Sequence, residues 1–438
     1  MVLSRRQFIT LMSLGAAGAA FSLPFKRLHP AAWLSQVQAS ATYGPLRRDP
    51  DGLLDLPVRF RYRVFSREGD RMSDGSRVPG RHDGMGAFAD ATGNTVLVRN
   101  HELAPRHAEG IQAPPDRQYD PLGKGGTTTL IVSPDRQLLR HYVSLAGTVQ
   151  NCAGGTTPWG SWVSSEETTL TPAENSSLHP DRVSKRHGYN FEVPATAAAP
   201  VVPRPLIAMG RFRHEAIAVD PRTGIVYQTE DREDGLFYRF IPATPGRLEA
   251  GRLEALRIPA VPQAITRAQF PQGIAIAVDW VPIEDVDPPE DTVRLEGFRK
   301  GAAQFSRGEG ICYSDGMTYF TCTNGGNVPH GQVWRYVPGH TPEAGGTLEL
   351  FVQPDDPNIL DYPDNLVMAP WGDLLVCEDG GGEQYIVGIK PNGTCYPFAR
   401  NALNMAEFAG VCFSPDGRTM FVNLYQPGMT FAIWSEAG

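Results

Sequence analysis

Short apolar segments alternate with turn-forming polar residues along most of the chain. Six times, a turn that contains glycine leads into a short apolar run, such as Val96-Leu97-Val98 or Leu374-Leu375-Val376. Such runs, bounded by Asp, Pro and Gly, are typical of β-hairpins, because glycine tolerates the positive φ of tight turns. The six turns are Asp90-Ala91-Thr92-Gly93, Pro158-Trp159-Gly160, Asp220-Pro221-Arg222-Thr223-Gly224, Ser314-Asp315-Gly316, Pro370-Trp371-Gly372 and Pro415-Asp416-Gly417.

The spacing of these turns predicts a repeat architecture. Successive turn glycines are 67, 64, 92, 56 and 45 residues apart. Four-stranded propeller blades need about 40–45 residues, so the wider intervals indicate insertions. No long amphipathic helical pattern interrupts the series, and the 46 Gly and 38 Pro residues suit many short strands joined by turns. We therefore predict an all-β, six-bladed β-propeller with long inter-strand insertions.

The N-terminus has the pattern of an export signal. Twin arginines in Ser4-Arg5-Arg6-Gln7-Phe8-Ile9-Thr10 precede an apolar segment, 11–24, and small residues at Ala39-Ser40-Ala41 offer a cleavage site. This combination predicts a twin-arginine (Tat) signal peptide over residues 1–41, followed by one domain over 42–438. The apolar segment is shorter than the roughly 20 residues of a membrane span. We expect a periplasmic or secreted monomer that meets the Tat machinery and has no stable membrane insertion after cleavage.

Charge narrows the classes of function. The formal net charge is −8, and loss of residues 1–41 removes four basic and no acidic residues, giving −12. An acidic chain is a poor candidate for binding nucleic acid. Six cysteines are too few for a disulfide scaffold of 438 residues. The acidic residues are therefore either solvated or gathered around cations.

Each predicted hairpin begins with a potential metal ligand, seven to ten residues before its turn glycine. Equivalent strand ends of a propeller lie on one face around the axis, so we expect these side chains to form a ring. Packed carboxylates repel one another unless cations neutralise them, which favours a metal centre. The six residues are Asp83, Cys152, Glu215, Glu309, Asp364 and Glu407.

A second set of polar residues follows each turn and should surround the first, because a hairpin returns to the face that it left. Carboxylate and amide oxygens favour Ca²⁺, Mg²⁺ or Mn²⁺, whereas a thiolate at Cys152 indicates a softer metal such as iron. The second set comprises Asn100, Glu102, Glu166, Glu167, Glu230, Asp231, Glu378, Asp379 and Asn423, with a weaker member at Thr323 and Asn324.

Residues beside these ligands suggest further roles. Arg307 lies two residues before Glu309, so both side chains face the same way in a strand, and a guanidinium beside a metal cluster can bind phosphate or carboxylate. It could equally serve only to neutralise the acids. His101 and His214 are adjacent to acidic candidates in sequence and should point the other way, so we expect them to support ligands rather than bind metal.

At this level of detail the motifs resemble those of the PhoX alkaline phosphatases, over about residues 80–425. The cysteine motif with its double glutamate is the most specific part of the resemblance. The motifs are His82-Asp83-Gly84-Met85, Arg99-Asn100-His101-Glu102, Asn151-Cys152-Ala153-Gly154-Gly155 continuing to Glu166-Glu167, Arg213-His214-Glu215, Arg307-Gly308-Glu309, Pro363-Asp364-Asn365 and Glu407-Phe408-Ala409-Gly410.

The resemblance implies a phosphate monoester hydrolase with an Fe(III)–Ca(II) cluster. It implies that Cys152 bridges two irons and that Arg307 holds the phosphate, which makes both catalytic. It implies further cluster ligands at Glu215, Glu309, Asp364 and Glu407, calcium ligands at Asn100, Glu102 and Glu167, and an additional ligand at Asp231. Residues near the cluster without an assigned metal are Asp83, Glu166, His101, His214 and Asn365.

Two alternatives stay open at this point. The first is a calcium-only propeller hydrolase of the lactonase kind, which would not need Cys152. The second is a non-enzymatic propeller in which calcium is purely structural and the ring face binds a partner. The phosphatase interpretation rests partly on analogy of fold and site.

Overall fold

The computed structural model describes residues 43–175, 180–341 and 344–436. The predicted export signal over 1–41 lies outside these residues. Strands dominate the described chain, which contains one α-helix, α2 (Val293–Arg299), and three 3-10 helices, η3 (Pro115–Arg117), η4 (Pro172–Glu174) and η5 (Ile207–Met209). No helix in the described ranges is long and apolar enough to cross a membrane.

The strands of the described residues form five sheets. One sheet contains β4 (His82–Ala89), β5 (Thr95–His101), β6 (Gly125–Val132) and β7 (Leu138–Thr148). Another contains β8 (Asn151–Thr156), β9 (Ser161–Glu166) and β10 (Asn190–Pro194). A third contains β24 (Phe408–Phe413), β25 (Met420–Leu424), β26 (Met429–Ser435) and β3 (Phe60–Arg67). A fourth contains β20 (Pro363–Met368), β21 (Leu374–Glu378), β22 (Tyr385–Ile389), β23 (Cys395–Asn401), β2 (Leu54–Pro57) and β1 (Leu46–Arg47).

The fifth sheet has nine strands in two halves. One half is β11 (His214–Val219), β12 (Val226–Glu230), β13 (Phe237–Thr244) and β14 (Arg247–Arg257). The other is β16 (Gly308–Ser314), β17 (Met317–Cys322), β18 (Gln332–Pro338) and β19 (Gly346–Val352). Strand β15 (Ile276–Pro282) pairs with β14 and β19 and so joins the halves at their outer edges.

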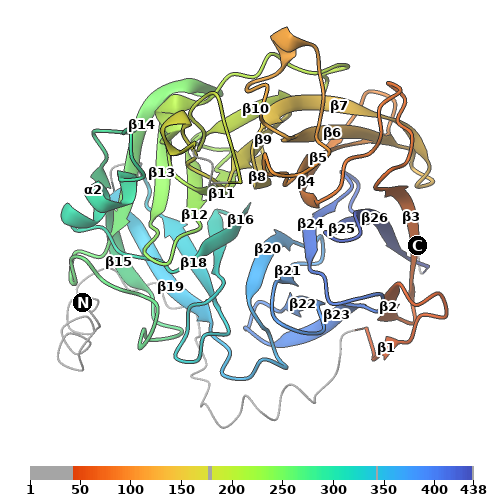
Figure 1. The fold of residues 1–438 in the computed structure, drawn as a ribbon. Coiled ribbons are helices and arrows are strands. Elements are labelled where there is room, and N and C mark those ends of the chain that lie inside the picture. The colour runs from red at the N-terminus through yellow and green to blue at the C-terminus, as the bar shows by residue number, and fades with distance from the viewer. Residues whose placement is uncertain (1–42, 176–179, 342–343, 437–438) are drawn as a thin grey trace.

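The sheets are arranged around a common axis (Figure 1). Strands β4, β8, β11, β16, β20 and β24 each end a sheet on the inner side, and each contacts the next in this order. The last of them, β24, contacts β4 and closes the ring. Strand β3, from the beginning of the described chain, pairs with β26 near its end, so hydrogen bonds between the two ends of the described chain also close the circle. The structure thus confirms the prediction of an all-β, propeller-like fold.

All six predicted hairpins are present as antiparallel pairs that start at these inner strands. Their turn glycines, from Gly93 to Gly417, all have positive φ, between 70° and 91°. This backbone region is costly for residues with a Cβ, which explains why the same residue type recurs at the six turns. The turn signal in the sequence therefore identified the correct hairpins.

Apolar side chains fill the space between neighbouring sheets. Between the two halves of the nine-stranded sheet, Phe237 of β13 stacks on Phe320 of β17 with ring centroids 4.3 Å apart, and both are buried. Burial of each ring contributes about 1.5–3 kcal/mol. This packing holds the inner strands at fixed angles, so that their ends present side chains to the same central region.

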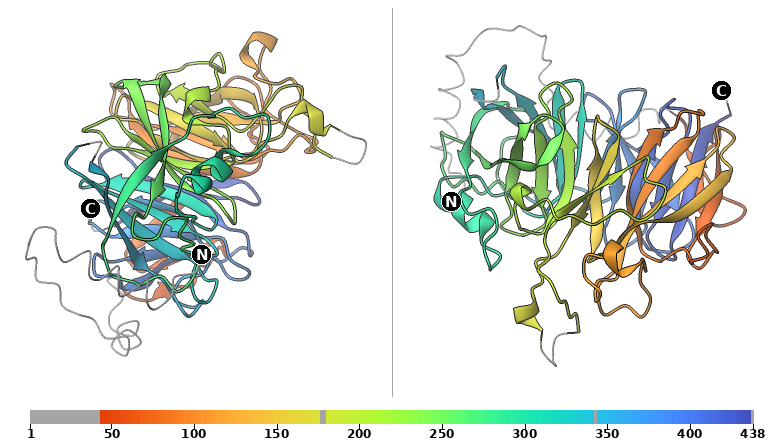
Figure 2. Two further views of the ribbon diagram at one scale, coloured as in Figure 1. Left: turned by 90° about the vertical axis from the view of Figure 1, so that its left-hand side faces the viewer. Right: turned by 90° about the horizontal axis from the view of Figure 1, so that it is seen from above.

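Two insertions leave the ends of β5 and β9 and carry η3 and η4. Figure 2 shows both projecting from one face of the ring. Because the inner strands begin where β5 and β9 end, this is the face on which the candidate ligands lie. The long inter-strand insertions predicted from the sequence therefore border the candidate site.

Candidate metal and phosphate site

The inner strands share a local irregularity at the positions of the predicted ligands. In β4, β8, β11, β16 and β20 the pairing register shifts across two residues, as between His82 and Met85 of β4. Such a β-bulge redirects side chains and is common next to functional sites. The first residue of each bulge is a predicted ligand: Asp83, Cys152, Glu215, Glu309 and Asp364.

The chain enters four of these bulges through a left-handed residue two positions before the ligand. The φ angles are 53° at Arg81, 49° at Gln150, 51° at Arg307 and 50° at Tyr362. Each of these residues accepts, at its carbonyl, a hydrogen bond from the residue that follows the returning strand. The donors are Glu102, Glu167, Thr323 and Asp379, so the backbone itself brings the second set of side chains beside the first.

The sixth predicted ligand does not occupy the matched position. The carbonyl of Glu407 accepts the N–H of Tyr425 at 3.2 Å, as the carbonyl of Arg81 accepts that of Glu102. Glu407 therefore corresponds to Arg81, and Ala409 corresponds to Asp83. The expectation of six ligands at matched positions was wrong for this one, because hairpin length varies and the distance to the turn glycine does not fix the register.

Side chains of several returning strands fasten one inner strand to the next. Asn423 donates to the carbonyl of Asp83 at 2.5 Å, and Thr229 and Thr321 donate to the carbonyls of Glu309 and Asp364 at 2.5 and 2.9 Å. Glycines after the ligands permit this close approach. A Cβ on Gly310 would lie 2.5 Å from the carbonyl oxygen of Asp364.

Asn100 has the same fastening role, which corrects its predicted role as a calcium ligand. Its Nδ2 donates to the carbonyls of Cys152 and Ala153 at 3.1 and 2.6 Å. Its Oδ1 accepts from Trp162 Nε1 and Ser164 Oγ, both at 2.9 Å, and the residue is fully buried. Both lone pairs of the amide oxygen are therefore used within the protein, and this arrangement does not fit a metal ligand.

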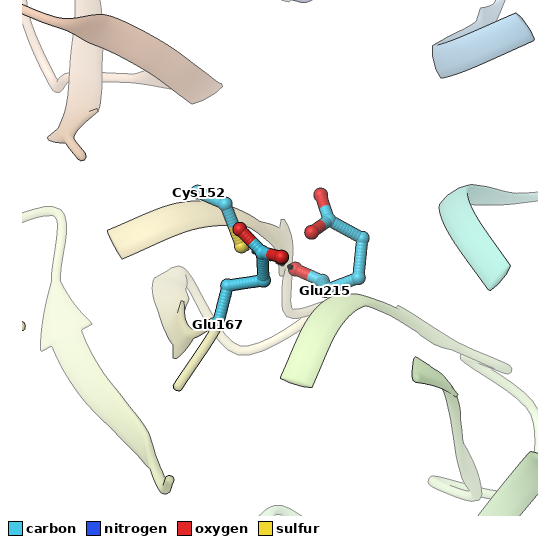
Figure 3. Close-up of side chains that lie close together, drawn as sticks. All are labelled: Cys152, Glu167 and Glu215. Carbon is cyan, nitrogen blue, oxygen red and sulfur yellow. Dashed lines mark hydrogen bonds between the residues drawn. The ribbon is translucent and has the colours of Figure 1, made fainter. Parts of the chain in front are cut away.

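Two groups of ligand atoms lie close enough to hold a cation. Cys152, Glu167 and Glu215 form one, and Glu215, Glu309 and Asp364 form the other, with all ligand atoms within 4.8 Å of one another in each group. Figure 3 shows the first group converging from β8, the residue after β9, and β11. Glu215 belongs to both groups, so the two candidate cation positions are adjacent.

Electrostatics supports a requirement for cations. Burial raises the pKa of Asp83, Glu215, Glu309 and Glu407 well above the ordinary range, neighbouring carboxylates add to this, and the pKa of Asp364 rises to about 7. Nine carboxyl groups interact with one another in this region, and the guanidinium groups that interact with them belong to two residues, Arg213 and Arg307. The nine are Asp83, Glu102, Glu167, Glu215, Asp231, Glu309, Asp364, Asp379 and Glu407.

The donor set fits multivalent cations of two kinds. So many ionised carboxylates cannot remain together in a low-dielectric site without compensating positive charge. Burial also raises the pKa of the Cys152 thiol, with Glu215, Glu167 and Asp83 adding to the effect, so a thiolate there needs a metal to stabilise it. Oxygen ligands suit hard cations, and the thiolate suits a transition metal.

Asp231 differs from the other acids because two arginines flank it. Arg307 donates from Nε to Asp231 Oδ1 at 2.9 Å and from Nη2 to Glu309 Oε1 at 2.7 Å. Arg213 lies 3.5 Å from Asp231 Oδ2 and hydrogen-bonds Glu167. Burial opposes ionisation of Asp231, but the hydrogen bond with Glu167 and the charge of Arg307 lower its pKa. Neither three-residue group includes Asp231.

Glu166 and Asn365, predicted near the cluster without a metal, have clear partners. Glu166 points away from the ring: Oε1 accepts from Val149 N at 2.9 Å and lies 2.7 Å from His187 Nδ1. Asn365 Nδ2 donates to Asp364 at 3.1 Å while its Oδ1 accepts the N–H of Gly410 at 2.6 Å. Asn365 thus orients a candidate ligand.

His101 and His214 also lie outside the cluster. His101 contacts the carbonyl of Gly80 at 2.8 Å and Thr128 Oγ1 at 2.9 Å. His214 contacts the carbonyl of Gly210 at 2.9 Å. Burial lowers the pKa of both histidines, so both are neutral. Their ring nitrogens bind the framework rather than the central region.

Two residues of this site were not among the ligands and phosphate-binding residues that the sequence assigned: Asp379, which was placed only in the second set, and Arg213. Asp379 hydrogen-bonds Glu407 and has a raised pKa from burial, although Glu378-Asp379 has the same double-acid pattern as Glu166-Glu167. Arg213 lines a pocket of about 260 Å³ together with Arg307 and Asp231. The signal for Arg213 was the Arg-X-Glu spacing, which occurs at 213–215 as it does at 307–309.

Fold and site together define a class of protein: an all-β, propeller-like molecule whose buried carboxylates and thiol are suited to hold several cations. A family model described as alkaline phosphatase PhoX matches residues 41–428. The chain therefore belongs to the PhoX alkaline phosphatase family, a metal-dependent family, and it is a phosphate monoester hydrolase. This decides against the lactonase-like and non-enzymatic alternatives.

Comparison with solved structures supports the fold. The structure of Pseudomonas fluorescens PhoX in complex with vanadate, a transition-state analogue, has a TM-score of 0.72 and 19% sequence identity, covering 90% of this chain and 98% of that chain. At this identity the match establishes a shared fold. A gluconolactonase from Xanthomonas campestris has a TM-score of 0.40 and 10% identity, covering 85% and 97% of the two chains. No curated protein sequence matches the chain.

Proposed function

We propose that this phosphatase uses a cluster of Fe(III) and Ca(II), with iron bound through Cys152. The observation that carries the proposal is the convergence of Cys152 with Glu167 and Glu215, because a buried thiol beside two carboxylates is a mixed soft and hard ligand set. Glu309, Asp364 and Glu407 would complete the cluster, and Glu102 and Glu167 would hold calcium. Bound cations would supply positive charge that polarises the phosphoryl oxygens.

Arg307 would bind the phosphoryl group of the substrate. Its side chain is 30% exposed, its Nε and Nη2 are held by Asp231 and Glu309, and it lines the 260 Å³ pocket with Arg213 and Asp231. Fixed in this way, its guanidinium can stabilise negative charge on the phosphoryl oxygens without reorganising during the reaction. Vanadate in Pseudomonas fluorescens PhoX supports a site for a transferring phosphoryl group in this family.

We infer further that the ring has six blades, counting the two halves of the nine-stranded sheet separately. The protein would be exported through the Tat pathway by residues 1–41 and would act as a monomer in the periplasm or outside the cell. Arg5-Arg6 supports this, and replacing both with Lys should retain the protein in the cytoplasmic fraction.

The metal proposal is tested by elemental analysis of protein purified without added metals. We expect iron and calcium in the wild-type protein, and loss of iron but retention of the fold in Cys152→Ser. The Cys412→Ser variant is a control, because Cys412 is also buried on an inner strand but belongs to neither ligand group. Calcium alone, unchanged by Cys152→Ser, would refute the iron–thiolate assignment.

A further inference from the structure

Two arginines occupy the same position in neighbouring repeats. Arg213 and Arg307 each lie two residues before a ligand of the second group, Glu215 and Glu309. In both cases the carbonyl accepts the N–H of the residue after the returning strand, Asp231 for Arg213 and Thr323 for Arg307. The repeat geometry therefore brings two guanidinium groups to adjacent places on the rim of the cluster.

Both guanidinium groups belong to residues that line the same pocket. They lie on either side of Asp231, and both line the 260 Å³ pocket, together with Arg232, Glu233, Asp234 and Arg294. Their side chains are 28% and 30% exposed, so each is fixed by carboxylates yet accessible from solvent. Each pairs with a candidate cluster ligand as well, Arg213 with Glu167 and Arg307 with Glu309.

Arg213 also carries an unused donor. Its Nε is buried and has no hydrogen-bond partner, whereas Nε of Arg307 is bound to Asp231. A buried N–H group without an acceptor is costly and uncommon, and a bound anion is one way to satisfy it. A phosphoryl group has three non-bridging oxygens, which is more than one guanidinium can bind in the bidentate manner.

We propose that Arg213 binds the phosphoryl group together with Arg307, so that two guanidinium groups hold the substrate from adjacent repeats. This inference rests on the proposed role of Arg307. Two such groups beside the cations favour a phosphomonoester dianion, since it offers both the charge and the three oxygens. Asp231 keeps the two guanidinium groups apart and at fixed orientation.

The test compares the inhibition constants of inorganic phosphate and vanadate in Arg213→Lys, Arg213→Met and Arg307→Lys, with metal content measured for each. In these variants the loss of charge-assisted hydrogen bonds should weaken the binding of phosphate and vanadate roughly 10–100-fold. Arg213→Lys keeps the charge but not the planar fork, so it should still raise both constants about tenfold. Arg335→Lys serves as a matched control, because Arg335 is a partly buried arginine that pairs with Glu349 and belongs neither to the ligand groups nor to the pocket lining. Its inhibition constants should stay within twofold of wild type.

Each outcome decides the matter. Inhibition constants within twofold of wild type in Arg213→Lys, with metal content intact, would overturn the proposal. Loss of metal from Arg213→Lys would also overturn it, because Arg213 would then serve only to neutralise Glu167 and Asp231. If Arg213→Met alone loses metal, Arg213→Lys is decisive. Calorimetric binding of inorganic phosphate to metal-loaded protein separates this proposal from phosphatase activity, since it reads the Arg213 contact even if no ester is hydrolysed.

Discussion

A buried histidine outside the cluster predicts a loss of stability at alkaline pH. His187 lies between two carboxylates, with Nδ1 2.7 Å from Glu166 and Nε2 3.3 Å from Asp120, and none of the three side chains is exposed. Asp120 also accepts the N–H groups of Ser184 and Lys185 at 2.6 and 2.8 Å. The charged histidine therefore attaches the insertion after β9 to the sheet that carries the site.

The size of the effect follows from the shift in pKa. Although burial disfavours the charged form, the charge of Glu166 and the hydrogen bond with Asp120 raise the pKa of His187 from 6.5 to about 9. A rise of roughly 2.5 units corresponds to about 3 kcal/mol at 1.36 kcal/mol per unit. Because the folded-state pKa is the higher one, this stabilisation is complete below pH 6.5 and disappears as the pH rises through about 9.

Thermal unfolding of wild type and His187→Gln between pH 6 and 10 measures this contribution. We expect the wild type to be more stable near pH 7 and the difference to shrink as the pH passes 9, since both proteins then lack the charged histidine. Limited proteolysis of the insertion around η4 should accelerate over the same range in the wild type only. A difference that stays constant from pH 7 to pH 10 would refute a charged His187.

Three further predictions concern the ring. Gly310→Ala should lower the free energy of unfolding by about 1–3 kcal/mol, because the new Cβ would lie 2.5 Å from the carbonyl oxygen of Asp364. The control Gly381→Ala, which has open space around its Cβ, should leave the free energy of unfolding unchanged in the same assay. After chelation the protein should lose thermal stability as the pH rises from 5 to 8, because burial raises the pKa of Asp364 to about 7 and its ionisation then adds charge beside other buried carboxyl groups. A pH-independent melting temperature would contradict this. Asn100→Ala should lower the free energy of unfolding by about 1–3 kcal/mol without changing calcium content, and loss of calcium would restore its ligand role.

The hairpins could be predicted because their signal is local. A turn with a positive φ favours glycine, and the apolar run beside it must be buried. The signal for each hairpin therefore lies within about a dozen residues. Local sequence patterns do not predict which outer strands pair with one another. That β15 joins β14 to β19, and that β3 pairs with β26, depends on contacts between segments far apart in the chain.

The sequence predicted which residues converge in the candidate site better than it predicted the contacts that each of them makes. Acidic residues at the starts of repeated strands indicated the ring, and Glu215, Glu309 and Asp364 do converge. Sequence spacing could not show that Asn100 uses its amide to fasten β8, because that depends on the distance between adjacent inner strands. Nor could it show the register of Glu407, which is set by a hydrogen bond to Tyr425.

The displaced register of Glu407 indicates how the site is layered. Each repeat can present a side chain at the bulge and another two residues before it, as Arg307 and Glu309 do when they hydrogen-bond each other. The bulge position carries the candidate metal ligands Cys152, Glu215, Glu309 and Asp364. The position two residues earlier carries Glu407 in one repeat and Arg213 and Arg307 in two others. Neighbouring repeats therefore supply a candidate cation ligand and phosphate-binding groups from the same position, two residues before the bulge.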